Sequence, residues 1–232
     1  MLIRELGTLL TGYWDADFVG SISEATGSVS SWRDLVAGYN TSQATALSQP
    51  GYSPSAFNGR PCLTFDGTNH FLNLASVPFP TGAAACEIWA LVDQEALAAD
   101  ATGRRIFSYG GTSANNSRWI ARAVSGGVNR GGTGGGSGAA QANVNGTIVD
   151  FSGRHVVRGT FDGALIGVSV DGNALATTAL VPATSTTRTR IGAATPNTAT
   201  NFFQGKIAAV AVTPLLTAEQ ESSMRAFLSA RI

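Results

Sequence analysis

The sequence predicts an all-β fold, a two-sheet antiparallel sandwich with one short C-terminal helix. Apolar segments of strand length recur along the chain, and clusters of Gly, Asn, Asp, Ser and Pro separate them. Two Asp-Gly steps, at residues 162–163 and 171–172, bracket one such segment and favour tight hairpin turns. The chain has 232 residues, of which 44% are apolar, and this is enough for one sandwich with a sizeable core.

Period-2 alternation places the strands. In the segment that begins at Pro61, Leu63 and Phe65 point one way and Cys62 points the other. The turn at residues 66–69 then predicts a hairpin with the segment that follows. We expect strands at residues 13–14, 61–66, 71–74, 86–92, 105–109, 118–124, 155–161, 164–170, 188–192 and 205–212.

Breaker residues place the loops. Residues 19–31 are rich in Ser and Gly, and residues 36–58 contain several Gly, Asn and Pro, so both segments are expected to be irregular. Residues 96–101 suit a brief helical turn. Residues 126–138 are mostly glycine, which suits either a linker or a loop. Strands of the same kind lie on both sides, so we expect a Gly-rich loop inside one domain.

The domain is therefore expected to span residues 1–232, with residues 1–12 as an N-terminal arm or an edge strand. A helix closes the chain, since Thr217 and Gln220 are spaced for a capping box. Its apolar residues recur at helical spacing and are expected to dock on the sandwich. They are Met224, Phe227, Leu228 and Ile232.

Composition excludes several classes of function. Only 13% of the residues are charged and the formal net charge is zero, which argues against nucleic acid as a partner. No stretch of eighteen apolar residues predicts a membrane span, and the first residues do not form a secretory signal. Cys62 and Cys86 form no disulfide framework or metal pattern, and we expect two buried thiols.

Several motifs, in this order, resemble those of laminin-G-like domains in the concanavalin-A-like lectin/glucanase superfamily. The resemblance covers the chain from about residue 13 onward and implies a two-sheet jelly roll. It also implies a sugar- or protein-binding module, of a kind frequent in bacterial surface proteins and in phage particles. The motifs are Trp32-Arg33-Asp34, Asn58-Gly59-Arg60-Pro61, Leu63-Thr64-Phe65-Asp66-Gly67, His155 to Gly163, Val168 to Gly172, and Gly205 to Val212 followed by Leu216 to Gln220.

Catalysis is not expected from the sequence. The glucanase branch of this superfamily carries Glu-Xaa-Asp-Xaa-Xaa-Glu on one strand, and no such run occurs here; Asp93-Gln94-Glu95 is the nearest approach. His70 and His155 have no carboxylate pattern typical of a metal site. The protein is thus predicted not to be an enzyme and to need no cofactor. Calcium is the one ion that the resemblance leaves open, with Asp15, Asp17, Asp66 and Asp162 as its candidate ligands.

A carbohydrate site needs an exposed aromatic ring beside planar polar groups. The segment from Tyr109 to Trp119 offers such a set on a rim. The candidates are Tyr109, Asn115, Asn116, Arg118 and Trp119. The alternative is an ordinary loop followed by a core tryptophan.

Two classes of function remain. The first is a non-enzymatic structural or adhesion protein of a virion, as a phage head decoration or a tail or fibre component. It would contact other virion proteins, form a homo-oligomer and meet cell-surface glycan. The alternative is a carbohydrate-binding module of a secreted or cell-surface bacterial protein.

Overall fold

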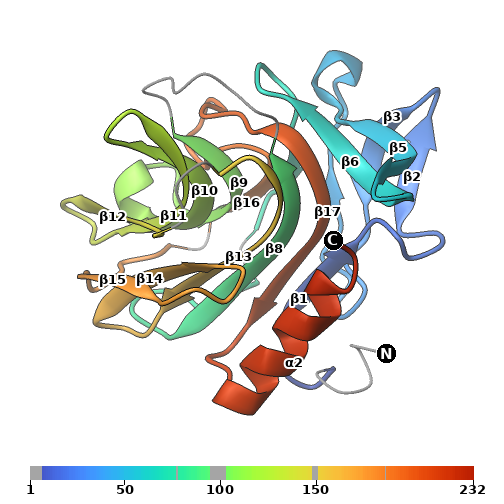
Figure 1. Cartoon of the computed structure of the whole chain (residues 1–232). Helices are drawn as coiled ribbons and strands as arrows, with labels where there is room; N and C mark the ends of the chain where they lie inside the picture. Colours follow the sequence, from blue (N-terminus) through green and yellow to red (C-terminus); the bar gives the residue numbers. More distant parts are fainter. Residues whose placement is uncertain (1–6, 77, 95–102, 148–150, 186) are drawn as a thin grey trace.

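The computed structural model describes residues 7–76, 78–94, 103–147, 151–185 and 187–232. Within them the protein is all-β with one α-helix, and every pairing between strands is antiparallel (Figure 1). The strands are β1 (Gly12–Asp15), β2 (Ile22–Ala25), β3 (Ser28–Trp32), β4 (Thr41–Ser42), β5 (Gly51–Phe57), β6 (Arg60–Asp66), β7 (Leu72–Leu74), β8 (Cys86–Gln94), β9 (Arg104–Gly110), β10 (Ser117–Ser125), β11 (Val128–Gly136), β12 (Gln141–Asn145), β13 (Gly153–Phe161), β14 (Leu165–Val170), β15 (Ala176–Ala179), β16 (Arg188–Ile191) and β17 (Gln204–Thr213). The helix is α2 (Ala218–Ser229), and single 3-10 turns lie at Ala46–Ser48 and Ala114–Asn116.

The strand pairings form two series that face one another across a core. The β8 series runs β15–β14–β13–β8–β17, and β1 and β6 share the far edge of β17. The β10 series runs β12–β11–β10–β9–β16–β7–β4–β3–β2. A single pairing, Ser28 with Gly51, connects the series through β3 and β5. The result is a nearly closed antiparallel shell (Figure 1).

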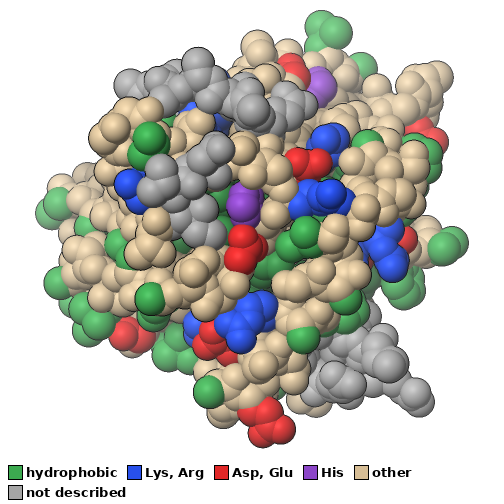
Figure 2. Space-filling model, viewed as in Figure 1, with side chains coloured by type: hydrophobic (Ala, Val, Ile, Leu, Met, Phe, Trp, Pro, Cys, Tyr) green, Lys and Arg blue, Asp and Glu red, His purple; other side chains and the backbone are tan. Residues whose placement is uncertain are grey.

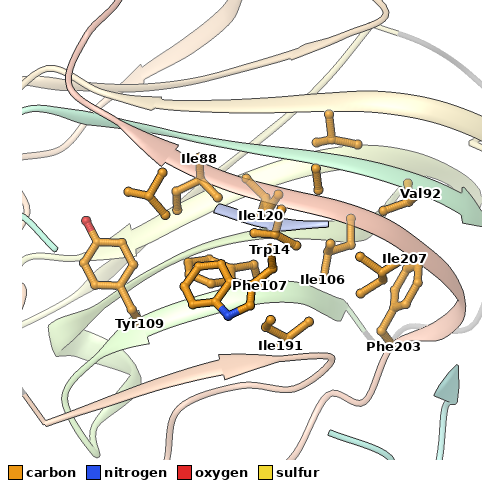
Figure 3. Packing of buried hydrophobic residues seen from close by; sticks show 14 of the residues in the cluster. Trp14, Ile88, Val92, Ile106, Phe107, Tyr109, Ile120, Ile191, Phe203 and Ile207 are labelled. Carbon is orange, nitrogen blue, oxygen red and sulfur yellow. The ribbon is translucent and has the colours of Figure 1, made fainter. Parts of the chain in front are cut away.

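Aromatic and branched side chains from both series fill the shell. The ring of Trp14 lies 6.0 Å from those of Phe79 and Phe107, measured between centroids. Figure 3 shows Ile88 of β8 and Ile120 of β10 close to Trp14 and Phe107 in this cluster. All of these side chains are at most 4% exposed. The alternation read from the sequence is confirmed here, because the inward residues of β6 and β14 belong to this core.

The helix α2 covers the outer side of β8 and β17. The Thr217 side chain accepts from the Gln220 backbone N–H, and the Gln220 side chain accepts from the Thr217 N–H, so the predicted capping box is confirmed. Met224 and Leu228 are buried against an outer cluster that includes Trp89. The predicted docking stripe is confirmed at these two positions and at half-buried Phe227, but not at Ile232, which is exposed.

Ion pairs fix the helix and the chain end to the strands. Arg158 of β13 contacts Glu87 of β8 and Glu221 of α2, each at 2.7 Å. Arg231 pairs with buried Asp15 of β1 at 3.0 Å. Figure 2 shows acidic and basic side chains next to one another on the face that carries α2. The charges on this side of the molecule therefore compensate one another locally.

Asp34 is the buried polar anchor of the Trp32–Asp34 segment. Its carboxylate accepts four backbone N–H groups, from Tyr13 at 2.7 Å, Val36 at 3.2 Å, Ala37 at 2.8 Å and Tyr39 at 3.1 Å. It thereby ties β1 to the turn that follows β3, and it replaces the water that these donors would otherwise need.

The segment after β6 corrects the sequence prediction. Residues 61–66 and 71–74 do not form a hairpin, since β6 pairs with β5 and β17 while β7 pairs with β4 and β16. Asp66 accepts the N–H groups of Thr68, Asn69 and His70, so the Asp-Gly step closes a local turn that passes from one series to the other. Likewise, the expected loops before and after Trp32 contain β2 to β5.

The prediction of a Gly-rich loop at 126–138 is wrong, because most of this segment is strand β11, which lies between β10 and β12. Its glycines lie where side chains would collide. A Cβ at Gly131 would meet Val170 Cγ2 at 2.5 Å and Phe151 at 3.2 Å on the core side. A Cβ at Gly134 would lie 2.5 Å from the Trp119 ring on the outer side. Close packing on both faces explains the composition.

The predictions for the N-terminal segment, residues 96–101 and the two cysteines have the following outcomes. Residues 1–6 and 96–101 lie outside the described residues, but Thr11 already donates its N–H to Val212 of β17 at 2.8 Å. Cys62 and Cys86 are buried and unpaired, as predicted. In the described part of the chain, no helix is long and apolar enough to cross a membrane.

Replacing Asp34 by Ala removes the acceptor of four N–H groups. We expect Asp34→Ala to lower the free energy of unfolding by about 3 kcal/mol or more, since each buried unsatisfied donor costs about 1–3 kcal/mol. Chemical denaturation measures this change. The exposed neighbour Arg33 supplies the control, and an Arg33→Ala variant that is equally destabilised would contradict the assignment.

Gly131→Ala tests the packing of β11. The new methyl group collides with Val170, so we expect a loss of about 1–3 kcal/mol in the free energy of unfolding. Gly103→Ala is the matched control, because its Cβ would meet its nearest atom at 3.5 Å. Thermal unfolding of both variants checks the difference, and equal stability would show that the glycine is not needed for packing.

Candidate functional site

Two adjoining hollows lie on the outer surface of β9 to β12, opposite the core. Their volumes are about 220 and 270 Å³, and they share Arg105, Trp119 and Asn201. We call the two together the Arg105–Trp119 groove. The first hollow is also lined by Gly103, Ala121, Ala123, Val124, Gly132, Thr133, Asn143 and Asn145. The second is also lined by Ser108, Ser117, Gln141, Ala194, Thr195 and Pro196.

A bulge in β9 places the guanidinium in this groove. The register shifts between β9 and β10, so that Phe107 opposes Ile120 but Arg105 opposes Ala121. The extra residue, Ile106, turns inward beside Phe107 and joins the core. Arg105 consequently faces outward on the same side as Trp119.

Trp119 forms the floor between the two hollows. Its side chain is only 2% exposed, because β11 approaches closely at Gly134. The Thr133 hydroxyl donates to the Trp119 carbonyl at 2.6 Å, which fixes β10 against β11. The ring is thus held rigidly, and a ligand would meet mainly the group that lies over it.

That group is the Arg105 guanidinium, which lies 4.1 Å from the Trp119 ring centroid. Burial lowers the pKa of Arg105 to about 9. Among the described residues none accepts a hydrogen bond from its side chain, and none of those lining the groove is Asp or Glu. Within the described part of the chain, the guanidinium is therefore held by an aromatic ring, and its N–H donors have no acceptor.

Amide side chains surround the pair. Asn143 and Asn145 project from β12 into the first hollow, and Gln141 lines the second. Asn201 touches both hollows and is oriented by donating its Nδ2 to the Gly103 carbonyl at 2.7 Å. Amides carry both donors and acceptors, so this wall suits a hydroxyl-rich ligand.

The structure does not bring the five sequence-predicted site residues together. Tyr109 is fully buried in the core cluster, and its hydroxyl donates to the Pro80 carbonyl at 3.1 Å. Arg118 is also fully buried and donates to Thr184 and to the carbonyls of Gly82 and Ala84. Both point away from the groove, into the fold.

The other three predicted residues lie on or near the outer side. Trp119 lines both hollows. Asn115 is half-buried before β10, where it donates to the Ala139 carbonyl at 3.1 Å and accepts from Gln141 at 3.2 Å. The Asn116 carbonyl accepts the N–H of Gly111, which closes its loop. Sequence reasoning missed Arg105 and the amides of β12.

The four aspartates expected as calcium ligands are dispersed and engaged. Asp15 pairs with Arg231, and Asp17 pairs with Arg60 at 2.7 Å. Asp66 and Asp162 each accept backbone N–H groups in their turns. In the described part of the chain, no group of three or more His, Cys, Asp or Glu could hold a metal ion. Calcium binding stays a prediction.

No protein-family model matches the sequence, and no curated protein matches it either. Solved structures do share the fold. Domain 4 of AbnA, an extracellular arabinanase from Geobacillus stearothermophilus solved with arabinotriose, has a TM-score of 0.61 and 16% identity, over 94% of this chain and 98% of that chain. An α-L-arabinofuranosidase has a TM-score of 0.70 and 12% identity, over 99% of this chain and 64% of its own length.

A phage protein shares the fold as well. Tailspike protein 2 of an Escherichia coli O157:H7 bacteriophage has a TM-score of 0.55 and 12% identity, over 77% of this chain and 26% of that chain. These identities are low, so the likeness concerns the fold, which is of a β-rich type found in glycoside hydrolases and tailspikes.

The prediction that the protein is not an enzyme is contradicted by these comparisons. It depended on one missing run of carboxylates, which marks a single branch of one superfamily. The structures that share the present fold include an arabinofuranosidase and a domain of an arabinanase. Glycosidase activity therefore has to be measured for this chain.

Arg105 and Arg118 both lie over aromatic rings, and replacing each tests whether it is needed for the stability of the fold. Arg118 satisfies buried carbonyls, so Arg118→Met is expected to lower the free energy of unfolding by about 3 kcal/mol or more. Arg105→Met loses only the ring contact and relieves a desolvated charge, so the change should stay within about 1 kcal/mol. Denaturant titration compares them, and a large loss for Arg105→Met would make Arg105 a structural residue.

Proposed function

We propose that this protein binds a glycan in the Arg105–Trp119 groove, as a jelly-roll domain of a phage particle or of an extracellular protein. One observation supports the proposal most directly. The Arg105 guanidinium lies over the Trp119 ring, its N–H donors have no acceptor among the described residues, and amide side chains line the groove beside it. Such planar polar groups match the hydroxyl pairs of sugars, and the Trp119 ring, which is only 2% exposed, holds the guanidinium in place.

The fold comparisons support this setting. The similar structures include a domain solved with arabinotriose and a phage tailspike. The low share of charged residues also fits recognition by hydrogen bonds. Contact with other virion proteins and a homo-oligomeric state stay predictions, and mass spectrometry of purified phage particles against the secreted fraction would test the setting.

Binding is tested by calorimetry with arabinotriose, arabinan and the hits from a glycan array. We expect Asn143→Ala combined with Asn145→Ala to weaken binding at least about tenfold, since each lost hydrogen bond contributes about 1 kcal/mol. Asn40→Ala is the matched control, because Asn40 is exposed and lines neither hollow.

The same samples are analysed for shorter sugars. If shorter sugars appear, the protein hydrolyses the glycan as well as binding it. Loss of hydrolysis in the Asn143→Ala/Asn145→Ala variant would then show that hydrolysis and binding use the same groove. Unchanged affinity in the double variant, or no binding to any glycan, would contradict the proposal.

A further inference from the structure

Several cations of the described structure pair with a carboxylate, whereas Arg105 in the groove does not. Arg158, Arg231 and Lys206 each contact a carboxylate within 3.0 Å. Arg105 contacts no carboxylate of the described residues, and none of those lining the groove is acidic. A half-buried cation with no counter-ion among the described residues is costly, and a bound anion would lower that cost.

Two more arginines stand behind the wall of the second hollow. Arg190 of β16 donates to the Ala194 carbonyl at 2.5 Å and to the Pro196 carbonyl at 2.8 Å. Arg188 donates to the Pro196 carbonyl at 3.0 Å. Burial, and next the charge of Arg188, lower the pKa of Arg190 to about 10. These side chains add positive potential to the second hollow, where the Ala194–Pro196 stretch forms the wall.

We infer that the ligand of this groove is an acidic saccharide whose carboxylate meets the guanidinium edge of Arg105. The inference rests on the glycan-binding function proposed above and specifies its substrate class. A carboxylate would supply the counter-ion that the described groove residues lack, while the amides of β12 would take the sugar hydroxyls.

The stacked geometry favours a carboxylate in particular. The Arg105 Cζ lies over the Trp119 ring, and the N–H donors of a guanidinium are directed in its own plane, along its edges. A planar carboxylate accepts two parallel N–H bonds from such an edge. Sulfated sugars share the negative charge but are tetrahedral, and they serve as a separate arm of the test.

The test uses an array of uronic-acid, sialic-acid, sulfated and neutral oligosaccharides. The tightest acidic hit is then compared by calorimetry with its carboxyl-reduced form. We expect the wild-type protein to prefer the acid at least about tenfold, the worth of about one charge-assisted hydrogen bond. Arg105→Gln should abolish this preference, whereas Arg33→Gln, which removes an equal charge at an exposed site, should not.

Each other outcome has a distinct meaning. Equal affinity for the acid and its carboxyl-reduced form overturns the inference, and the proposed function survives if the Asn143→Ala/Asn145→Ala variant still weakens both. A preference for sulfated over carboxylated sugars overturns the carboxylate assignment. Binding of no glycan at all overturns the inference together with the function on which it rests.

Discussion

The pairing of β8 with β17 is the constraint on which the rest of the molecule depends. It runs from Gly205 opposite Gln94 to Thr213 opposite Glu87 with one irregularity. Both strands are buried on both faces, toward the core on one side and toward α2 and the outer cluster on the other. Because each strand also carries further partners on its free edge, β13 on β8 and β1 with β6 on β17, a shift of this register would displace the whole β8 series.

The groove depends on the opposite series in a different way. There β11 lies next to the edge strand β12, five of its nine residues are glycine, and Gly134 lets β11 lie close to Trp119. The ring is thereby immobilised before any ligand arrives, and Arg105 is stacked on it. A site that is rigid in advance loses little conformational entropy on binding. The composition that first suggests a flexible loop is thus what gives the proposed binding surface its fixed shape.

Sequence patterns predict much of the fold and little of the site. The Asp162-Gly163 hairpin, the central strands and the capped helix all follow from local chemistry. The prediction of the site was wrong because of strand geometry. Trp119 follows Arg118 in one strand and opposes Ser108, so neither Arg118 nor Tyr109 can share its face. Arg105 reaches that face only through a bulge, for which the sequence gives no signal.

The four tryptophans offer the most direct measurement, namely the indole N–H signals in a two-dimensional NMR titration with glycans. Trp14 and Trp32 lie in the core and Trp89 lies under α2, so each is an internal control. The account predicts that a bound glycan shifts the Trp119 signal and the Arg105 Nε–H signal while those three remain in place. Shifts confined to another tryptophan, or binding that leaves Trp119 and Arg105 unmoved, would contradict it.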